Sequence, residues 1–254
     1  MCCETAAPET DILAEAVRLL RAAEESSVPL RLIGGLAIRM HIPAGVAPAF
    51  PREYQDIDLV TAGGRSRDVG DLLTGLGYQA DRQFNALNGR TRLLFLDVRN
   101  RRQVDVFVGT FEMCHIVPVA DRLEVSALGI PLAELLLTKM QIVELNPKDM
   151  TDVLTMLYHH DVADTDAGAA INAQRVAELC AADWGLWRTT KVNTERVRRA
   201  IPQAGLEPAA QRLMLDRLDR LWQRIDAVPK PRAWRIRDRI GDRKRWYQQP
   251  DEVA

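Results

Sequence analysis

The sequence predicts an α+β protein in which a part with mixed strands and helices is followed by an entirely helical part. Two observations indicate this division. Short β-prone apolar runs alternate with amphipathic stretches up to about residue 109, whereas the periodic segments after residue 131 have helical spacing. We therefore expect one domain over residues 1–125 and a helical domain over residues 126–254. The chain has 254 residues, 47% of them hydrophobic, so both parts can bury a core.

The first part begins with an amphipathic helix at residues 11–26, for which Asp11 suits the N-cap. Residues 28–33 predict a strand that leads into Gly34-Gly35, and residues 36–40 predict a short helix. Three prolines and a glycine make residues 42–52 a loop.

Three further strands and one further helix complete the first part. The strands are expected at residues 56–61, 92–99 and 103–109, and the helix at residues 67–76. The last two strands would form a hairpin through a turn at residues 100–102. These elements predict a mixed β-sheet flanked by helices.

Two helices begin the second part, at residues 131–145 and 148–160, separated by Asn146-Pro147. The polar, small residues 161–170 are expected to be a linker. Everything from residue 172 onward has helical character, with breaks at Ile201-Pro202 and Val228-Pro229.

The net charge, the cysteines and the length of the apolar runs indicate what kind of protein this is. The formal net charge is −1, so the whole chain has no polyelectrolyte character. The four cysteines form no CxxC pair and no disulfide framework. Apolar runs stay well below the roughly 20 residues that span a bilayer. We expect a soluble cytoplasmic protein with no membrane partner.

Two carboxylates one residue apart are the strongest chemical signal. Asp56 and Asp58 fall within an apolar, β-prone run, and residues two apart on a strand point to the same face. Two acids on one face repel each other unless a cation lies between them. Mg²⁺ binds through one or two carboxylates together with substrate phosphates. The pair therefore predicts a site that handles a nucleoside triphosphate on Mg²⁺, with Mn²⁺ as an alternative; the competing interpretation is an exposed edge strand.

A third carboxylate, Asp105, lies within the strongly apolar run Val104 to Val108. Asp is depleted in strand interiors and is rarely buried without a partner. The metal of Asp56 and Asp58 would be such a partner. Asp105 could then also act as the base for an attacking hydroxyl group.

The order of these features resembles the nucleotidyltransferase fold of the polymerase-β type. Gly34-Gly35 is followed by a spacer, by the motif Arg52-x-x-x-Asp56-Ile57-Asp58-Leu59, and by an isolated Asp105 on a later strand. Residues 130–139 (Ile-Pro-Leu-Ala-Glu-Leu-Leu-Leu-Thr-Lys) and 148–153 (Lys-Asp-Met-Thr-Asp-Val) resemble the AbiEii-type toxin nucleotidyltransferases. The resemblance covers roughly residues 30 to 160. It departs from the usual pattern at Tyr54 and in a long, proline-rich spacer.

The resemblance implies roles for residues of the first part. Gly34 and Gly35 would contact the triphosphate, and Asp56 and Asp58 would hold the metal. From the residues alone, we also expect Arg52 to pair with an active-site acid or a phosphate. The alternative for the glycine pair is an ordinary turn, and the alternative for Arg52 is a solvated loop residue.

In the helical part, the resemblance implies that Lys139 contacts the phosphates or stabilises the leaving pyrophosphate. Asp149 or Asp152 would complete the site or orient Lys139. A lysine on an apolar helix can instead extend its ammonium group to solvent. Acids near a helix start can serve as caps and interact with the helix dipole.

A basic segment, Lys230 to Tyr247, ends the helical part. It holds eight basic residues and two acids, with Trp234, Trp246 and Tyr247 among them. Arginines interleaved with aromatic residues suit backbone contacts and base stacking on single-stranded RNA. The equally weighted alternative is a basic helix face whose tryptophans pack on the protein.

These expectations combine into Mg²⁺-dependent transfer of a nucleoside monophosphate from an NTP to an acceptor hydroxyl group. The basic segment favours RNA, such as a tRNA 3′ end, as the acceptor. A small hydroxylated molecule of the aminoglycoside type is the first alternative, and a degenerate protein that binds a nucleotide or a partner is the second. The family resemblance also implies a cognate antitoxin.

Overall fold

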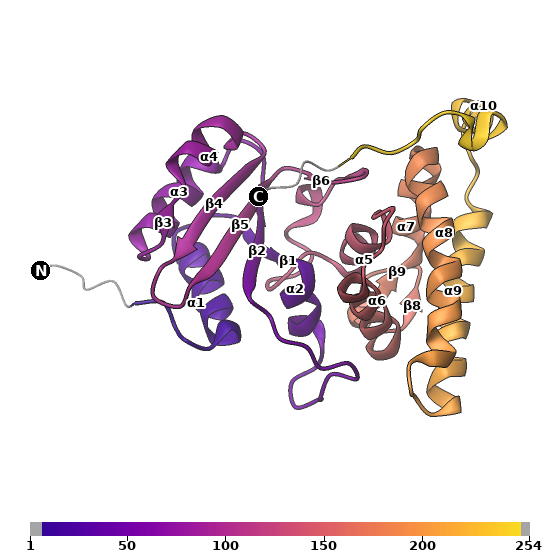
Figure 1. The fold of residues 1–254 in the computed structure, drawn as a ribbon, viewed down its shortest axis with the longest axis horizontal. Coiled ribbons are helices and arrows are strands. Elements are labelled where there is room, and N and C mark those ends of the chain that lie inside the picture. Colours follow the sequence, from indigo (N-terminus) through magenta and orange to yellow (C-terminus); the bar gives the residue numbers. More distant parts are fainter. Residues whose placement is uncertain (1–6, 250–254) are drawn as a thin grey trace, which may run out of the picture. The chain divides into compact units, whose positions relative to one another are not determined.

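The computed structural model describes residues 7–249. Within them the chain has mixed α/β structure and forms two compact units (Figure 1). Unit 1 comprises residues 7–44, Arg52–Phe111 and Pro118–Pro131, and unit 2 comprises Gly45–Pro51, Glu112–Val117 and residues 132–249. The predicted mixed sheet flanked by helices is confirmed, as is the helical character of the later part.

Unit 1 is built on a five-stranded sheet with the order β1-β2-β5-β4-β3. Strands β2 and β5 are parallel, and the other neighbouring strands are antiparallel. The strands are β1 (Leu30–Ile33), β2 (Asp56–Thr61), β3 (Gln79–Ala80), β4 (Arg92–Asp97) and β5 (Arg102–Val108). The helices are α1 (Ile12–Glu25), α2 (Gly34–His41), α3 (Ser66–Gly75) and α4 (Arg82–Asn88).

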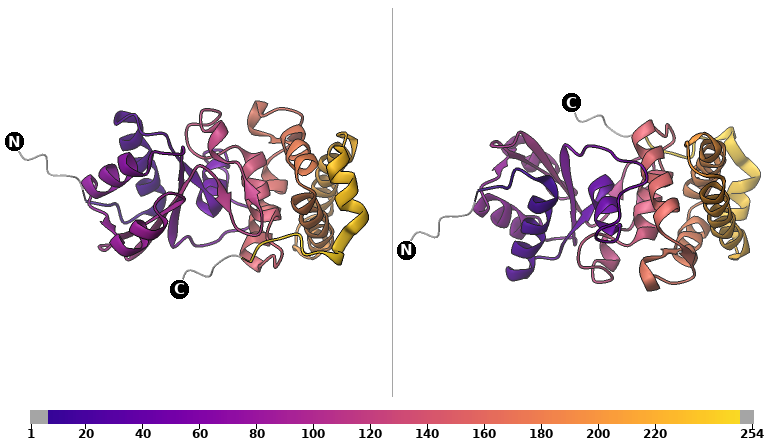
Figure 2. Two further views of the ribbon diagram at one scale, coloured as in Figure 1. Left: turned by 90° about the horizontal axis from the view of Figure 1, so that it is seen from above. Right: turned by 90° about the horizontal axis from the view of Figure 1, so that it is seen from below.

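The two faces of this sheet differ. One face carries apolar side chains that are almost fully buried, among them Ile57, Leu59, Phe95, Val104 and Val106. Helices α1 and α3 pack against the sheet strands and help to enclose this core (Figures 1 and 2). Because strand side chains alternate between faces, the neighbouring positions of β2 and β5 direct their acids to the opposite face.

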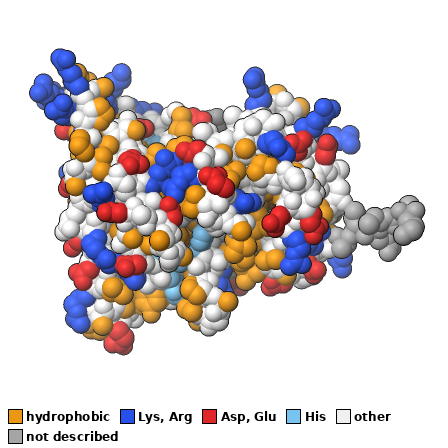
Figure 3. Space-filling model, turned by 180° about the vertical axis from the view of Figure 1, so that it is seen from behind, with side chains coloured by type: hydrophobic (Ala, Val, Ile, Leu, Met, Phe, Trp, Pro, Cys, Tyr) orange, Lys and Arg blue, Asp and Glu red, His pale blue; other side chains and the backbone are white. Residues whose placement is uncertain are grey.

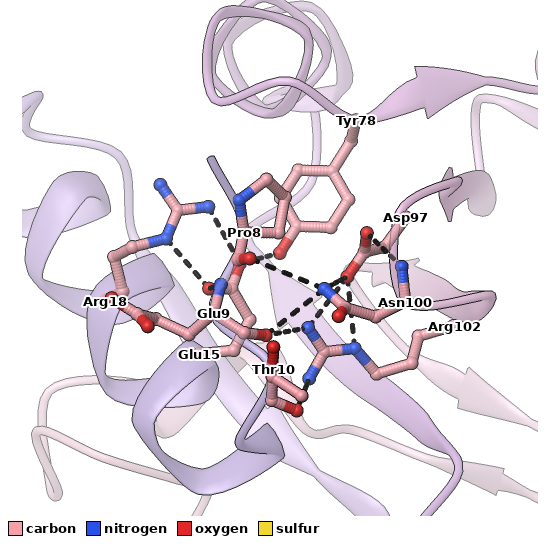
Figure 4. A network of polar contacts seen from close by, with 9 residues as sticks. All are labelled: Pro8, Glu9, Thr10, Glu15, Arg18, Tyr78, Asp97, Asn100 and Arg102. Carbon is pink, nitrogen blue, oxygen red and sulfur yellow. Dashed lines mark hydrogen bonds and ion pairs between the residues drawn. The ribbon is translucent and has the colours of Figure 1, made fainter. Parts of the chain in front are cut away.

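A short N-terminal segment is hydrogen-bonded to the turn between β4 and β5 and to the start of β5 (Figure 4). The guanidinium group of Arg102 donates to the backbone oxygens of Glu9 and Thr10 and to the Asp97 carboxylate, at 2.7 Å from Oδ2. Asn100 donates to the same Asp97 oxygen at 2.8 Å. Asp97 and Arg102 are both buried, so this network offsets the cost of burying their charges.

Glu15 forms the second half of this network from helix α1. Its buried carboxylate accepts hydrogen bonds from Arg18, from the Tyr78 hydroxyl and from the backbone N–H of Glu9 (Figure 4). Burial alone would raise the pKa of Glu15, but the hydrogen bonds from Arg18 and Tyr78 outweigh it and lower the pKa. The network therefore ties α1 to the end of α3 and to the N-terminal segment.

Unit 2 consists mainly of packed helices. They are α5 (Leu132–Met140), α6 (Pro147–His159), α7 (Ala173–Ala182), α8 (Trp184–Ala200), α9 (Pro208–Ala227) and α10 (Arg232–Ile240). Two short strand pairs accompany them, one formed by β6 (Phe111–Glu112) and β7 (Ile116–Val117), the other by β8 (Val162–Ala163) and β9 (Ile171–Asn172). The helix breaks expected at Ile201-Pro202 and Val228-Pro229 are confirmed.

Several segments differ from their sequence-based predictions, and the short strands β3, β6 and β7 were not predicted. Helix α2 already begins at Gly34, so the glycine pair forms its first turn. Helix α4 was missed because it buries none of its residues and so has no apolar periodicity. Helix α5 ends at Met140, where Asn193 binds the backbone oxygens of Met140 and Ile142. Residues 161–170 are no plain linker, since β8 within them pairs with β9.

No helix in the described part of the chain is long and apolar enough to cross a membrane. Two cysteines, Cys114 and Cys180, are buried and not in disulfides. Burial raises the pKa of the Cys180 thiol to about 12, so this thiol stays protonated and contributes to packing.

Candidate functional site

The acids of β2 and β5 lie on one face of the unit 1 sheet. Asp58 and Asp105 are register partners on parallel strands, and Asp56 is paired with Gln103. Register partners share a face, and neighbouring strands are about 4.8 Å apart. Asp56 is exposed, Asp58 is half-buried and Asp105 is buried. The three predicted acids therefore form one group that runs from solvent into the sheet.

Gly34 makes room for the middle carboxylate of this group. It has a φ of +75°, and a Cβ added there would lie 2.4 Å from Oδ2 of Asp58. Both the left-handed backbone and the close approach require glycine. The N-cap of α2 is Ile33, which offers no side-chain hydrogen bond to the first turn. Helix N-terminal N–H groups of this kind can bind an anion.

Gly35 has a similar relation to Arg52. A Cβ at Gly35 would lie 2.7 Å from a guanidinium nitrogen of Arg52. The central carbon of the Arg52 guanidinium group lies 4.9 Å from the ring centroid of Tyr54, which is a cation–π contact. The structure thus places Arg52 over the first turn of α2. The sequence had allowed either a role in the site or a place in a solvated loop.

Asp105 has two protein partners. Its Oδ1 accepts a hydrogen bond from Nε of Arg92 at 2.7 Å, and its Oδ2 accepts one from Nε2 of Gln103 at 2.6 Å. Arg92 also lies over the rings of Phe84 and Phe107. The buried carboxylate is therefore neutralised by protein groups, whereas the sequence argument supplied only a metal as its partner.

Arg92 and Gln103 are the site residues that sequence reasoning missed. The β4–β5 hairpin contained a signal for Arg92. In its register Leu94 is the partner of Asp105, and Arg92 lies two residues before Leu94, so it is on the same face as Asp105. Gln103 is two residues before Asp105 and so also shares its face. Neither residue stands out by type alone.

The acids suit a divalent cation only in part. Within residues 7–249, no group of three or more His, Cys, Asp and Glu side chains forms a ready-made metal site. Mg²⁺ does not need one, since it binds through one or two carboxylates and keeps waters or substrate phosphates. Asp56 and Asp58 fit this requirement. Asp105 would have to exchange its hydrogen bonds with Arg92 or Gln103 to become a ligand.

A second group of predicted residues comes together in unit 2. Nζ of Lys139 on α5 lies 2.9 Å from Oδ1 of Asp149 and 3.0 Å from Oδ2 of Asp152, both on α6. The side chains are only 15%, 14% and 3% exposed, respectively. Burial would lower the pKa of Lys139, but the charges of Asp152 and Asp149 outweigh this and raise it. Lys139 is therefore a charged, firmly held ammonium group.

Asp149 forms the ion pair with Lys139 and also contacts the N-cap residue of α6. Asn146 is the N-cap of α6, and its Oδ1 accepts from the backbone N–H of Asp149 at 2.8 Å. Its amide Nδ2 donates to Asp149 Oδ2, also at 2.8 Å. The capping role and the role of orienting Lys139 thus coexist in one carboxylate.

The aromatic residues of the basic segment pack on unit 2. Trp234 is buried, donates to the Cys180 backbone oxygen and lies against Trp187. Trp246 donates to Thr189 and lies against Trp184. These two side chains follow the packing alternative for the segment, so base stacking on them is not supported.

The charges of the segment divide into two sets. Lys230 donates to backbone oxygens at the end of α9, and Arg237 donates to the backbone oxygens of Gly241 and Lys244. The other cations are exposed, and Figure 3 shows Lys and Arg side chains gathered at the end of unit 2 that carries α10. These exposed cations are Arg232, Arg235, Arg239, Arg243, Lys244 and Arg245.

No protein-family model matches this chain, and no similar sequence is found among curated proteins. The interpretation of its function therefore depends on its own residues and on the geometry described above.

Proposed function

We propose that this protein is an Mg²⁺-dependent nucleotidyltransferase that moves a nucleoside monophosphate from an NTP to a hydroxyl group of an acceptor RNA. One observation carries the proposal. Asp58 and Asp105 are register partners on the open face of the sheet, with Asp56 beside them and Gly34 directly against Asp58. This arrangement combines two metal-binding acids with a glycine turn whose backbone N–H groups suit phosphates.

In the proposed reaction, the acceptor oxygen forms a bond to the α-phosphorus of the NTP. The bond from that phosphorus to the bridging oxygen breaks, and pyrophosphate leaves with the electron pair. The proton of the hydroxyl group passes to Asp105, whose carboxylate Arg92 and Gln103 hold in place. Asp56 and Asp58 would hold Mg²⁺, which when bound neutralises charge on the phosphates.

The other predicted residues would act on the phosphate groups. Backbone N–H groups of Gly34 and Gly35 would contact the triphosphate, and Arg52 would add a positive charge beside them. Lys139, oriented by Asp149 and Asp152, would stabilise the leaving pyrophosphate. Because two acids already pair with Lys139, this role requires that a phosphate oxygen join or replace one of them.

RNA is supported as the acceptor by the charge of the segment Lys230–Tyr247. Arg232, Arg235 and Arg239 recur at i, i+3 and i+7 on α10 and are exposed, so they form a stripe along one side of the helix. Such a stripe suits contact with successive phosphates. A cytoplasmic reaction remains part of the proposal through the cysteine content and the short apolar runs of the sequence. A cognate antitoxin remains part of it through the family resemblance alone.

A thermal-shift titration with each NTP tests the nucleotide site. We expect an NTP to raise the melting temperature only when Mg²⁺ is present, because a ligand that binds the folded state stabilises it. The double variant Asp56→Ala/Asp58→Ala should fold and lose the shift. An exposed pair outside the site, Asp71→Ala/Glu24→Ala, serves as the control.

A transfer assay completes the test. The protein is mixed with Mg²⁺, total RNA and an NTP that is labelled at either the α- or the γ-phosphate; α-label is measured in RNA, and γ-label is measured in the released pyrophosphate. A metal-dependent shift without labelled RNA would favour a small-molecule acceptor. Absence of both the shift and the label would support the degenerate binding protein and defeat the proposal.

A further inference from the structure

A pocket of about 760 Å³ lies in unit 1 at the edge of the sheet formed by β3 and β4. Its lining includes Gln79, Arg82, Leu94, Leu96 and Gln103. This volume falls within the range of roughly 300–1,000 Å³ that is usual for small-molecule sites. The proposed reaction has so far used no residue of β3.

The strand register connects this pocket to the acids. Gln79 pairs with Leu96, Leu96 pairs with Gln103, and Gln103 pairs with Asp56. Register partners share a face, so the four side chains form one row across the sheet. All four are exposed. The part of the pocket that Gln79, Leu96 and Gln103 line therefore lies on the same face as the carboxylates.

One lining residue touches the proposed base directly. Gln103 donates to Asp105 Oδ2 at 2.6 Å, and Leu94 is the register partner of Asp105 on β4. A molecule in the pocket would thus lie beside Asp105, on the side away from Gly34 and the NTP site. That position suits the acceptor, whose hydroxyl group must lose its proton to Asp105.

The chemistry of the lining indicates what kind of group fits. Asp81 and Arg82 are the charged residues among those lining the pocket, so their charges cancel. A phosphate would need several cations, and a polycationic aminoglycoside would need several acids. Leucine side chains offer an apolar surface for a flat ring, and the amides of Gln79 and Gln103 offer donors and acceptors for its edge.

We propose that this edge pocket binds the terminal nucleobase of the acceptor RNA and directs the ribose hydroxyl group toward Asp105. The inference rests on the proposed function and adds the location of the acceptor. The RNA backbone would leave the pocket toward solvent, and the neutral lining makes the site selective for the base.

The test combines a protein variant with a changed RNA in one thermodynamic cycle. Leu96→Glu introduces a charge at a side chain that is 43% exposed, so the fold should tolerate it. The RNA probe is a labelled single-stranded oligonucleotide, compared with the same oligonucleotide lacking its 3′-terminal base. Binding of both RNAs to both proteins is measured by fluorescence anisotropy at fixed salt.

We expect Leu96→Glu to weaken binding of the intact RNA about tenfold, in line with the loss of one stacked base. Removal of the terminal base should weaken binding to the wild type by a similar factor and have little further effect on the variant. Such non-additivity places the base against Leu96. Additive effects, or no effect of either change, would overturn the proposal.

The matched control is Leu87→Glu, which adds the same charge to the same unit at a side chain that is 78% exposed and outside the pocket. An equal loss of RNA binding in this control would reduce the effect to charge repulsion and overturn the proposal. The Mg²⁺-dependent NTP shift, measured on all three proteins, separates the two hypotheses. If that shift is present and the cycle is additive, only the pocket assignment fails; if the shift and transfer are absent in the wild type, the nucleotidyltransferase itself fails.

Discussion

Both units bring carboxylates close together, but their surroundings differ between unit 1 and unit 2. On the sheet, Asp56 is exposed and Asp58 lies against a glycine, so part of the acidic group faces solvent. In unit 2, Asp149 and Asp152 close around Lys139 and all three side chains are largely buried. An open acidic group can receive a cation or substrate, whereas a closed ion-pair cluster holds its own geometry.

The buried acid Asp105 belongs to both patterns. It is on the open face of the sheet, yet Arg92 and Gln103 donate a hydrogen bond to each of its two carboxylate oxygens. The comparison teaches that position in a motif does not determine how a carboxylate is neutralised.

Replacing Lys139 with Met should have the largest effect. It would leave two largely buried carboxylates without their cation, and we expect a loss of about 3–5 kcal/mol in the free energy of unfolding. Urea denaturation measures it. The exposed neighbour Lys148→Met should cost far less, and adding Asp152→Asn to Lys139→Met should recover part of the loss. Equal effects of the two lysine variants would contradict the closed cluster.

Gly34→Ala should have the next largest effect. The new Cβ would collide with Asp58 Oδ2 in a left-handed backbone, so we expect a loss of about 2–4 kcal/mol. The Mg²⁺-dependent NTP shift should disappear with it. Gly64→Ala has a similar φ of +79° but open space around the Cβ, and it isolates the backbone cost. If Gly64→Ala destabilised the protein as much as Gly34→Ala, the close approach to Asp58 would contribute nothing.

Glu15→Gln tests a closed network within unit 1. The folded-state pKa of Glu15 is lowered, so its stabilisation is present above the ordinary value of 4.5 and is lost as pH falls through the folded value. At pH 7 we expect a loss of about 1.5–3 kcal/mol, typical of hydrogen bonds to a charged group. Melting curves from pH 7 to pH 3 should show the two proteins converging in acid. The exposed Glu24→Gln should run parallel to the wild type throughout.

The smallest effect on stability is expected from removing the α10 stripe. Changing Arg232, Arg235 and Arg239 to Gln should alter unfolding by less than about 0.5 kcal/mol, because these side chains are exposed. It should reduce the slope of log K for RNA against log salt by about 2, as expected for three phosphate contacts.

A matched charge control separates a specific stripe from overall charge. It replaces three exposed arginines on other elements with Gln, namely Arg21, Arg67 and Arg199. An equal change of slope in this control would show that α10 has no special part in RNA binding.

Much of the fold could be read from local patterns. The strand at residues 56–61 and the helix breaks at Ile201-Pro202 and Val228-Pro229 have the predicted positions. Alternation and proline chemistry act over a few residues, so they are visible in the sequence. Helix α4 has no such signal and was missed.

In the candidate site, too, some features follow from local sequence and others only from the tertiary structure. The sequence by itself determined which acids share a strand face, because the spacing of Asp56 and Asp58 fixes it. Only the tertiary structure decided that Arg92 and Gln103 hold Asp105, that Asp149 and Asp152 close on Lys139, and that Trp234 and Trp246 pack inward. Apart from the contact of Gln103 with Asp105 within β5, these contacts join residues from different elements. Their partners are selected by packing and by the cost of burying an unpaired polar group.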